Sequence, residues 1–247
     1  MKTIIYMCTV TIIPKKNNDF VLTSNRDEAP CRISLAPDFY HIDNTKLLFP
    51  KDVISNGTWI GISDKNRVVC LLNGGFKSHI RKQYYIKSRG LVVNDFMTSS
   101  DLIETIENYN FTDIEPFTMV VVDWNIDLKF FELVWDGNRQ YFTRLPLEAK
   151  IWSSSTLYSE FMRNERLNWF QDFKSENNLE SKTILNFHKK AGSNNDEYGV
   201  IMNRGFIKTT SITQITKENN TLEMHYESLE NNIISSKIFN LPLTINE

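Results

Sequence analysis

Short apolar segments that come in pairs, each pair separated by a tight polar turn, constrain the fold of this chain most strongly. Residues 2–14 are β-branched and apolar at both odd and even positions, as in a strand buried on both faces. A Lys-Lys-Asn-Asn turn then leads to a second strand over residues 20–24. The same hairpin pattern predicts strands over residues 58–63 and 67–72, 117–123 and 129–135, 140–145, and 206–215 and 221–227.

Other segments have apolar residues at helical spacing. Ser100 and Asp101 are candidate caps of one of them, and a Lys-Lys-Ala-Gly sequence ends another. The predicted helices span residues 91–98, 102–108, 158–173 and 181–190. Because strands and helices occur in groups rather than in regular alternation, we expect an α+β fold with mostly antiparallel, layered sheets and outer helices. No linker-like composition interrupts the chain, which predicts a single domain over residues 1–247.

Composition excludes several classes of protein. With 28 Lys and Arg against 30 Asp and Glu among 247 residues, the chain lacks the basic excess of a general nucleic-acid binder. No run of about 18 apolar residues occurs, so we expect no stable membrane insertion. Three scattered cysteines form no disulfide framework, which favours a reducing, cytoplasmic location. The four histidines show no metal-ligand spacing, and we expect no metal site. The oligomeric state does not follow from the sequence.

Cys8 and the tetrapeptide Asn25-Arg26-Asp27-Glu28 form the one constellation that suggests chemistry. The tetrapeptide follows the second strand, so it forms either a solvated turn with an ion pair or a group of buried polar residues with partners. In the second case, the hairpin returns the chain beside Cys8. Arginine there favours a thiolate, and aspartate can orient an amine or thiol.

These residues resemble the NRDE family, also called the transport and Golgi organisation family. The likeness rests on Met7-Cys8 and the tetrapeptide, and it extends over nearly the whole chain through short, ordered motifs. These further motifs are Gly57-Thr58-Trp59-Ile60-Gly61, Ser88-Arg89-Gly90, Asn94-Asp95-Phe96 and Thr210-Ser211. The family resembles cysteine-type N-terminal-nucleophile hydrolases, relatives of penicillin V acylase and bile-salt hydrolase. The resemblance implies a four-layer α-β-β-α sandwich.

The same resemblance implies a cysteine amidohydrolase that cleaves a linear, non-peptide C–N bond of a small molecule. Cys8 would be the nucleophile, flanked by Arg26 and Asp27. Asn73 is either an oxyanion-hole donor or part of a tight turn. The residues expected to contact substrate are Asn25, Glu28 and Lys208. The alternative function, proposed for the wider family, is a non-catalytic carrier of haem or lipid on the same fold, with haem as cargo and no resident cofactor.

An N-terminal cysteine suits this chemistry because its own α-amine, with a pKa of about 7.7–8.0, can take the thiol proton. An internal peptide nitrogen is not basic. As written, the chain puts the amine of Met1 up to roughly 23 Å from Cys8, at about 3.3 Å per extended residue. Residues 1–7 are therefore expected to be a leader or a mis-assigned start, with translation beginning at Met7. If they are retained, they lengthen the first strand and catalysis is not expected.

The chain departs from the family pattern in three places. Trp152-Ser153-Ser154 stands where the family has Ser-Asn, which removes a candidate amide donor, and Lys208 replaces an arginine. Gly74-Gly75 follow Asn73 where the family has an aromatic and a basic residue. These departures weaken a claim to a specific substrate more than they weaken the scaffold resemblance.

Several other residues carry weaker signals. Cys70 is expected in the core and Cys31 in a loop, although a place near the site stays open for Cys31. One stretch concentrates basic residues on both sides of Tyr84 and Tyr85. It is interpreted as a solvated loop, as a rim for an anionic ligand, or as an RNA contact. Its basic residues are Lys77, Arg81, Lys82, Lys87 and Arg89.

Overall fold

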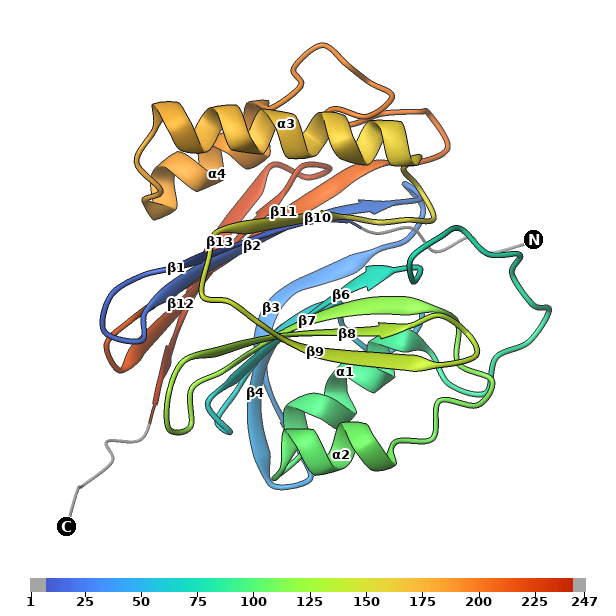
Figure 1. The fold of residues 1–247 in the computed structure, drawn as a ribbon, viewed down its shortest axis with the longest axis vertical. Helices are drawn as coiled ribbons and strands as arrows, with labels where there is room; N and C mark the ends of the chain where they lie inside the picture. The colour runs from blue at the N-terminus through green and yellow to red at the C-terminus, as the bar shows by residue number, and fades with distance from the viewer. Residues whose placement is uncertain (1–7, 242–247) are drawn as a thin grey trace.

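Two antiparallel sheets packed face to face, each covered by helices on its outer side, form the four layers of the structure (Figure 1). The computed structural model describes residues 8–241. Its first sheet has the strand order β10-β1-β2-β11-β12-β13, and its second has the order β3-β4-β5-β6-β7-β8-β9. The α+β sandwich expected from the sequence is therefore confirmed.

The first sheet contains both ends of the described chain. Its central strands pair along nearly their whole length, and a register shift between Thr209 and Ser211 marks a bulge in β11. The strands are β1 (Thr9–Pro14), β2 (Phe20–Glu28), β10 (Lys150–Ser153), β11 (Lys208–Glu218), β12 (Thr221–Ser228) and β13 (Ile233–Asn240).

The second sheet is a continuous antiparallel meander. Each strand pairs with the next strand along the chain, and the connection from β6 to β7 contains the helices of the outer layer. The strands are β3 (Ser34–Ile42), β4 (Thr45–Asp52), β5 (Ile60–Ser63), β6 (Arg67–Asn73), β7 (Phe117–Asp123), β8 (Lys129–Trp135) and β9 (Gln140–Leu145).

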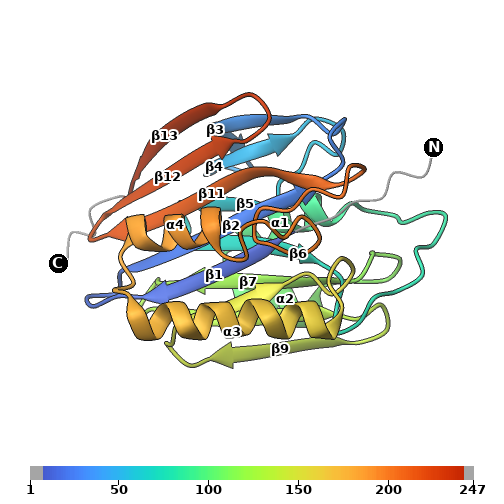
Figure 2. The same cartoon turned by 90° about the horizontal axis from the view of Figure 1, so that it is seen from above.

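The helices form the two outer layers. The second sheet is covered by α1 (Arg89–Thr98), which packs on β5 and β6, and by α2 (Leu102–Asn108). Over the first sheet, α3 (Glu160–Glu176) lies along β10 and α4 (Ser181–Lys190) lies over β2 and β11 (Figure 2). Asp101 accepts from the backbone N–H of Glu104 and caps α2, as expected from the sequence.

Strand β2 shows why the first sheet is buried on both faces. Phe20 and Leu22 point into the large core between the sheets, whereas Val21 packs with residues of α3 and α4. This alternation continues into the polar end of the strand, where Asn25 bonds to α4 and Arg26 bonds to the second sheet. Consecutive residues of β2 therefore serve different layers.

The structure corrects several expected boundaries. The first strand is described from Thr9, and residues 2–7 of the predicted strand lie outside the described residues. The tetrapeptide is part of β2 and fully buried, so the interpretation of a solvated turn was wrong. The long helix begins at Glu160 rather than at residue 158, because Ser159 caps it. Four strands were not predicted: β3, β4, β10 and β13.

Two glycines allow α1 to approach the second sheet. A Cβ added at Gly57 would lie 2.4 Å from the backbone carbon of Gly90, so the motifs that contain these glycines meet backbone to backbone.

We expect Gly57→Ala to lower the free energy of unfolding by about 3 kcal/mol, because the added methyl group could be accommodated only by moving one of the two backbones. Gly205→Ala is the control: its methyl would meet nothing, and its φ of 78° makes the expected cost about 1 kcal/mol. Urea unfolding monitored by tryptophan fluorescence measures both, and equal costs would contradict the prediction.

Candidate active site

Cys8 immediately precedes β1 and lies in the core between the two sheets. The register that pairs Thr9 with Asn25 sets Cys8 opposite Arg26 on the same face of the sheet. The thiol is fully buried, and the backbone N–H of Asp27 lowers its pKa. The hairpin thus brings together the cysteine and the tetrapeptide that the sequence singled out.

Burial raises the pKa of the Cys8 thiol well above its ordinary value. The negative charge of Asp27 raises this pKa further, whereas the Asp27 N–H and the Arg26 charge lower it. The raising effects win, so the thiol is protonated at neutral pH in the chain as described. A nearby base must take its proton before the sulfur can act as a nucleophile.

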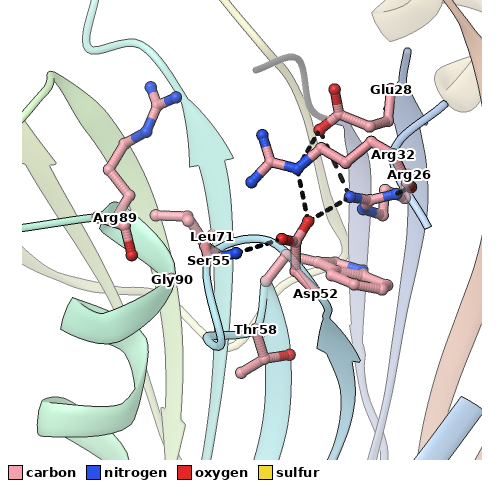
Figure 3. A pocket seen from close by; sticks show the side chains of 11 residues that line it. Arg26, Glu28, Arg32, Asp52, Ser55, Thr58, Leu71, Arg89 and Gly90 are labelled. Atoms are coloured by element: carbon pink, nitrogen blue, oxygen red, sulfur yellow. Dashed lines mark hydrogen bonds and ion pairs between the residues drawn. The ribbon is translucent and has the colours of Figure 1, made fainter. Parts of the chain in front are cut away.

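Arg26 belongs to a buried ion-pair network between the two sheets (Figure 3). Its guanidinium donates to Asp52 at 2.8 Å and lies 3.5 Å from Glu28, and it stacks over the ring of Trp59 at 4.6 Å. Arg32 donates to the same Asp52 oxygen at 2.6 Å. Two arginines and two carboxylates thus compensate one another beside Cys8. The pKa of Glu28 is raised because burial outweighs both arginines.

Asp27 points its side chain to the other face of the sheet. Its carboxylate accepts from the hydroxyls of Tyr158 at 2.6 Å and Thr209 at 2.7 Å. Burial raises the pKa of Asp27, and the charge of Arg166 and the two hydroxyls oppose this effect. The backbone N–H and the charge of Asp27 therefore act on the pKa of Cys8, while its carboxylate is hydrogen-bonded on the helix-covered face of the sheet.

Asn25 also faces the helices, and all its amide atoms are bonded. Its Nδ2 donates to the backbone carbonyls of His188 and Val200, which makes Oδ1 the acceptor toward His188 Nδ1 at 2.7 Å. The other ring nitrogen of His188 lies 2.8 Å from the Thr11 hydroxyl. These contacts fasten α4 to the first sheet, on the side away from the Cys8 thiol.

Asn73 ends β6 and is fully buried, yet neither atom of its side-chain amide has a hydrogen-bond partner. Ser154 connects this residue to the nucleophile candidate. The Ser154 backbone N–H donates to the Cys8 carbonyl at 3.1 Å, and its hydroxyl donates to the Asn73 carbonyl at 2.7 Å. Cys8 and Asn73 are thus both bonded to Ser154 through their backbone carbonyls, and the buried side-chain amide of Asn73 has both of its bonding atoms free.

Lys208 stands at the start of β11, opposite Glu28 in the strand register. Its ammonium group pairs with Glu230 at 3.1 Å and is partly exposed. Of the other cysteines, Cys70 is fully buried in the core between the sheets, as expected, and Cys31 is exposed. Between residues 8 and 241, no group of three or more His, Cys, Asp and Glu residues is arranged to hold a metal ion.

Several residues of the site were not singled out from the sequence. Asp52, the partner of both arginines, lies at the end of an unpredicted strand, and Arg32 lies just beyond the tetrapeptide. Tyr158 and Arg166 lie in the segment that the sequence predicts as a long helix, and no signal marked them as site residues. The one available signal was the tetrapeptide itself, since one buried arginine and two buried carboxylates require partners elsewhere in the chain.

The family described as Transport and Golgi organisation 2 matches residues 7–235 of this chain. The chain belongs to this family. The match covers the predicted nucleophile, the tetrapeptide and both glycine motifs. No curated protein sequence matches the chain.

Solved structures with similar folds are hydrolases and acylases by name. A mutant conjugated bile acid hydrolase from Clostridium perfringens is 12% identical with a TM-score of 0.53, over 96% of this chain and 97% of that one. The N-acylethanolamine-hydrolyzing acid amidase ortholog of Caenorhabditis elegans is 11% identical with a TM-score of 0.57, over 84% and 92%. Penicillin V acylase from Agrobacterium tumefaciens is 11% identical with a TM-score of 0.57, over 94% and 86%. These likenesses show an N-terminal-nucleophile-hydrolase-like fold.

No helix between residues 8 and 241 is long and apolar enough to cross a bilayer.

Proposed function

We propose that this protein is a cysteine amidohydrolase that cleaves a linear, non-peptide C–N bond, with Cys8 as an N-terminal nucleophile. One observation carries the proposal: Ser154 bonds to the backbone carbonyls of both Cys8 and Asn73, and the buried side-chain amide of Asn73 has no hydrogen-bond partner. The fold shared with an amidase and an acylase supports it.

The chemistry divides into acylation and hydrolysis. The freed α-amine of Cys8 takes the thiol proton, and Sγ attacks the carbonyl carbon of the amide. Asn73 Nδ2 donates to the oxyanion of the tetrahedral intermediate, which collapses when the leaving amine takes the proton back. Water then attacks the thioester, again with the α-amine as base, and releases the acid. Arg26 lowers the pKa of the thiol throughout.

This mechanism requires that residues 1–7 no longer precede Cys8. We infer that translation begins at Met7 or that the segment is removed, because only then is the Cys8 nitrogen basic. The family match, which begins at residue 7, supports this inference. The carboxylate of Asp27, whose charge acts on Cys8, would then stabilise the protonated amine as it forms.

The test combines mass spectrometry of the native N-terminus with a β-lactone probe that acylates nucleophilic cysteines. We expect a chain that begins at Cys8 and a single acyl group on that residue. Cys8→Ala should abolish labelling, whereas Cys70→Ala should retain it, because Cys70 is equally buried and burial raises its pKa to about 12. Exposed Cys31 reports general thiol reactivity through iodoacetamide.

A chain that keeps residues 1–7 and takes no label on Cys8 would contradict the proposal. The carrier of haem or lipid is the alternative. The cavity beside Arg26 has a volume of about 30 Å³, far too small for a haem, so the residues around the tetrapeptide offer no haem site there. The bonds that connect Cys8 and Asn73 through Ser154 favour the hydrolase, and it is the function we carry forward.

A further inference from the structure

The cavity between the sheets is lined by an unusual number of guanidinium groups. Arg26, Arg32 and Arg89 all contribute to its wall, and each is at least nine-tenths buried. Figure 3 shows Arg32 extending its guanidinium toward the side of the cavity that Arg89 lines. Arginines are rarely buried without partners, so the hydrogen bonds of these groups indicate what the cavity is built to hold.

Several hydrogen-bond donors on the wall of this cavity have no acceptor. Arg32 uses Nε for Asp52, but its Nη1 has no partner, and neither has Nε of Arg26. The indole N–H of Trp59, another wall residue, is also buried without an acceptor. Guanidinium and indole nitrogens only donate, so the occupant of this cavity must accept hydrogen bonds.

The charges around the cavity favour an anion. Asp52 and Glu28 compensate Arg26 and Arg32, while Arg89 has Glu115 at 3.1 Å. Glu115 is shared with Arg81, at 3.4 Å, and with His79. One carboxylate therefore serves two arginines, and the cluster has more cations than anions.

Burial and the neighbouring charges both act on the pKa of Arg89. Burial lowers it to about 10, and the charges of Arg81 and Arg32 add to the effect while Glu115 opposes it. An additional negative charge in the cavity would relieve the crowding.

We propose that this cavity holds the carboxylate of the substrate, anchored between Arg32 and Arg89, and that the enzyme acts on amides carrying such a carboxylate. The planar fork of a guanidinium matches a carboxylate, and a volume of about 30 Å³ admits such an end group. Arg26 connects the two sites, because it lines the cavity and lies opposite Cys8 in the strand register. This substrate class rests on the proposed function; the anion site itself does not.

The test measures binding in the full chain carrying Cys8→Ala, which removes any turnover. The probe is sodium acetate, compared with neutral acetamide and with sodium chloride at equal ionic strength, and the readout is isothermal titration calorimetry. We expect saturable acetate binding, with acetamide and chloride at least tenfold weaker. Adding Arg32→Gln should weaken acetate binding at least tenfold, whereas Lys82→Gln, which removes a charge from the exposed surface, should change it less than twofold.

Because Arg32→Gln also removes a partner of Asp52, the melting temperature of this variant with acetate is compared with its own melting temperature without acetate. A shift equal to that of the parent would overturn the site. Equal binding of acetate and chloride would overturn the carboxylate class. Binding by the Cys8→Ala chain without Cys8 acylation in the parent would reject the hydrolase and keep the anion site; acylation without acetate binding would reject only the site.

Discussion

Asn73→Leu is expected to lower kcat by about 10²–10³-fold while leaving the protein as stable as its parent or slightly more stable. The buried amide of Asn73 has no hydrogen-bond partner, so the folded state gains nothing from its polarity. An apolar residue of similar size removes this desolvation cost. In the reaction, the same substitution removes the donor to the oxyanion, where charge develops. Steady-state kinetics on a panel of acyl p-nitroanilides and a thermal melt measure the two effects.

Asn94→Leu is the matched control for this prediction. Asn94 is also buried and its side-chain oxygen also lacks a partner, but it lies on α1 rather than at the end of β6, where Asn73 is bonded to Ser154. We expect its kcat to stay within twofold of the parent. A loss of stability in Asn73→Leu with little change in kcat would instead assign Asn73 to the fold. A loss of activity in both variants would indicate a general effect of the substitution.

The predictable part of the fold is the part with local signals. Strands β7, β8 and β9 have the bounds that their apolar pattern and turns predict, as do α2 and α4. The four unpredicted strands lie at or near sheet edges or lack an apolar pattern. Strands β3 and β13 are largely exposed, β10 is four residues long, and β4 contains Pro50. Their positions are decided by pairing with distant segments, which periodicity does not encode.

The candidate site shows the same limit. The sequence could indicate that Arg26 and Asp27 need partners, but it could not indicate that the two side chains separate to opposite faces of β2. That separation follows from the strand continuing to Glu28, which in turn depends on pairing with β11 more than 180 residues later. Glu28 and Lys208 are opposite one another for the same reason: the register of β2 and β11 pairs them, and no local pattern in the sequence indicates it.

His188 is expected to make the stability of the protein strongly dependent on pH. Burial lowers its pKa to about 3, with a smaller contribution from the charge of Arg166, against 6.5 for an ordinary histidine. Between these values the unfolded chain binds a proton that the folded chain does not. The free energy of unfolding should therefore fall by about 1.4 kcal/mol for each pH unit below 6.5, roughly 5 kcal/mol by pH 3, with no contribution above pH 6.5.

The comparison of the parent with His188→Gln isolates this contribution, because the buried carboxylates also titrate in acid. Asp27 and Glu28, whose pKa values are raised, oppose the trend, and Asp52, whose pKa is lowered, adds to it, but all three remain in both proteins. Urea unfolding from pH 7 to pH 4 should show a stability difference that shrinks steadily toward acid. His41 is exposed on β3, so the free energy of unfolding of His41→Gln should change with pH as that of the parent does. A difference between parent and His188→Gln that stays constant with pH would mean that His188 is not held neutral by its burial between Thr11 and Asn25.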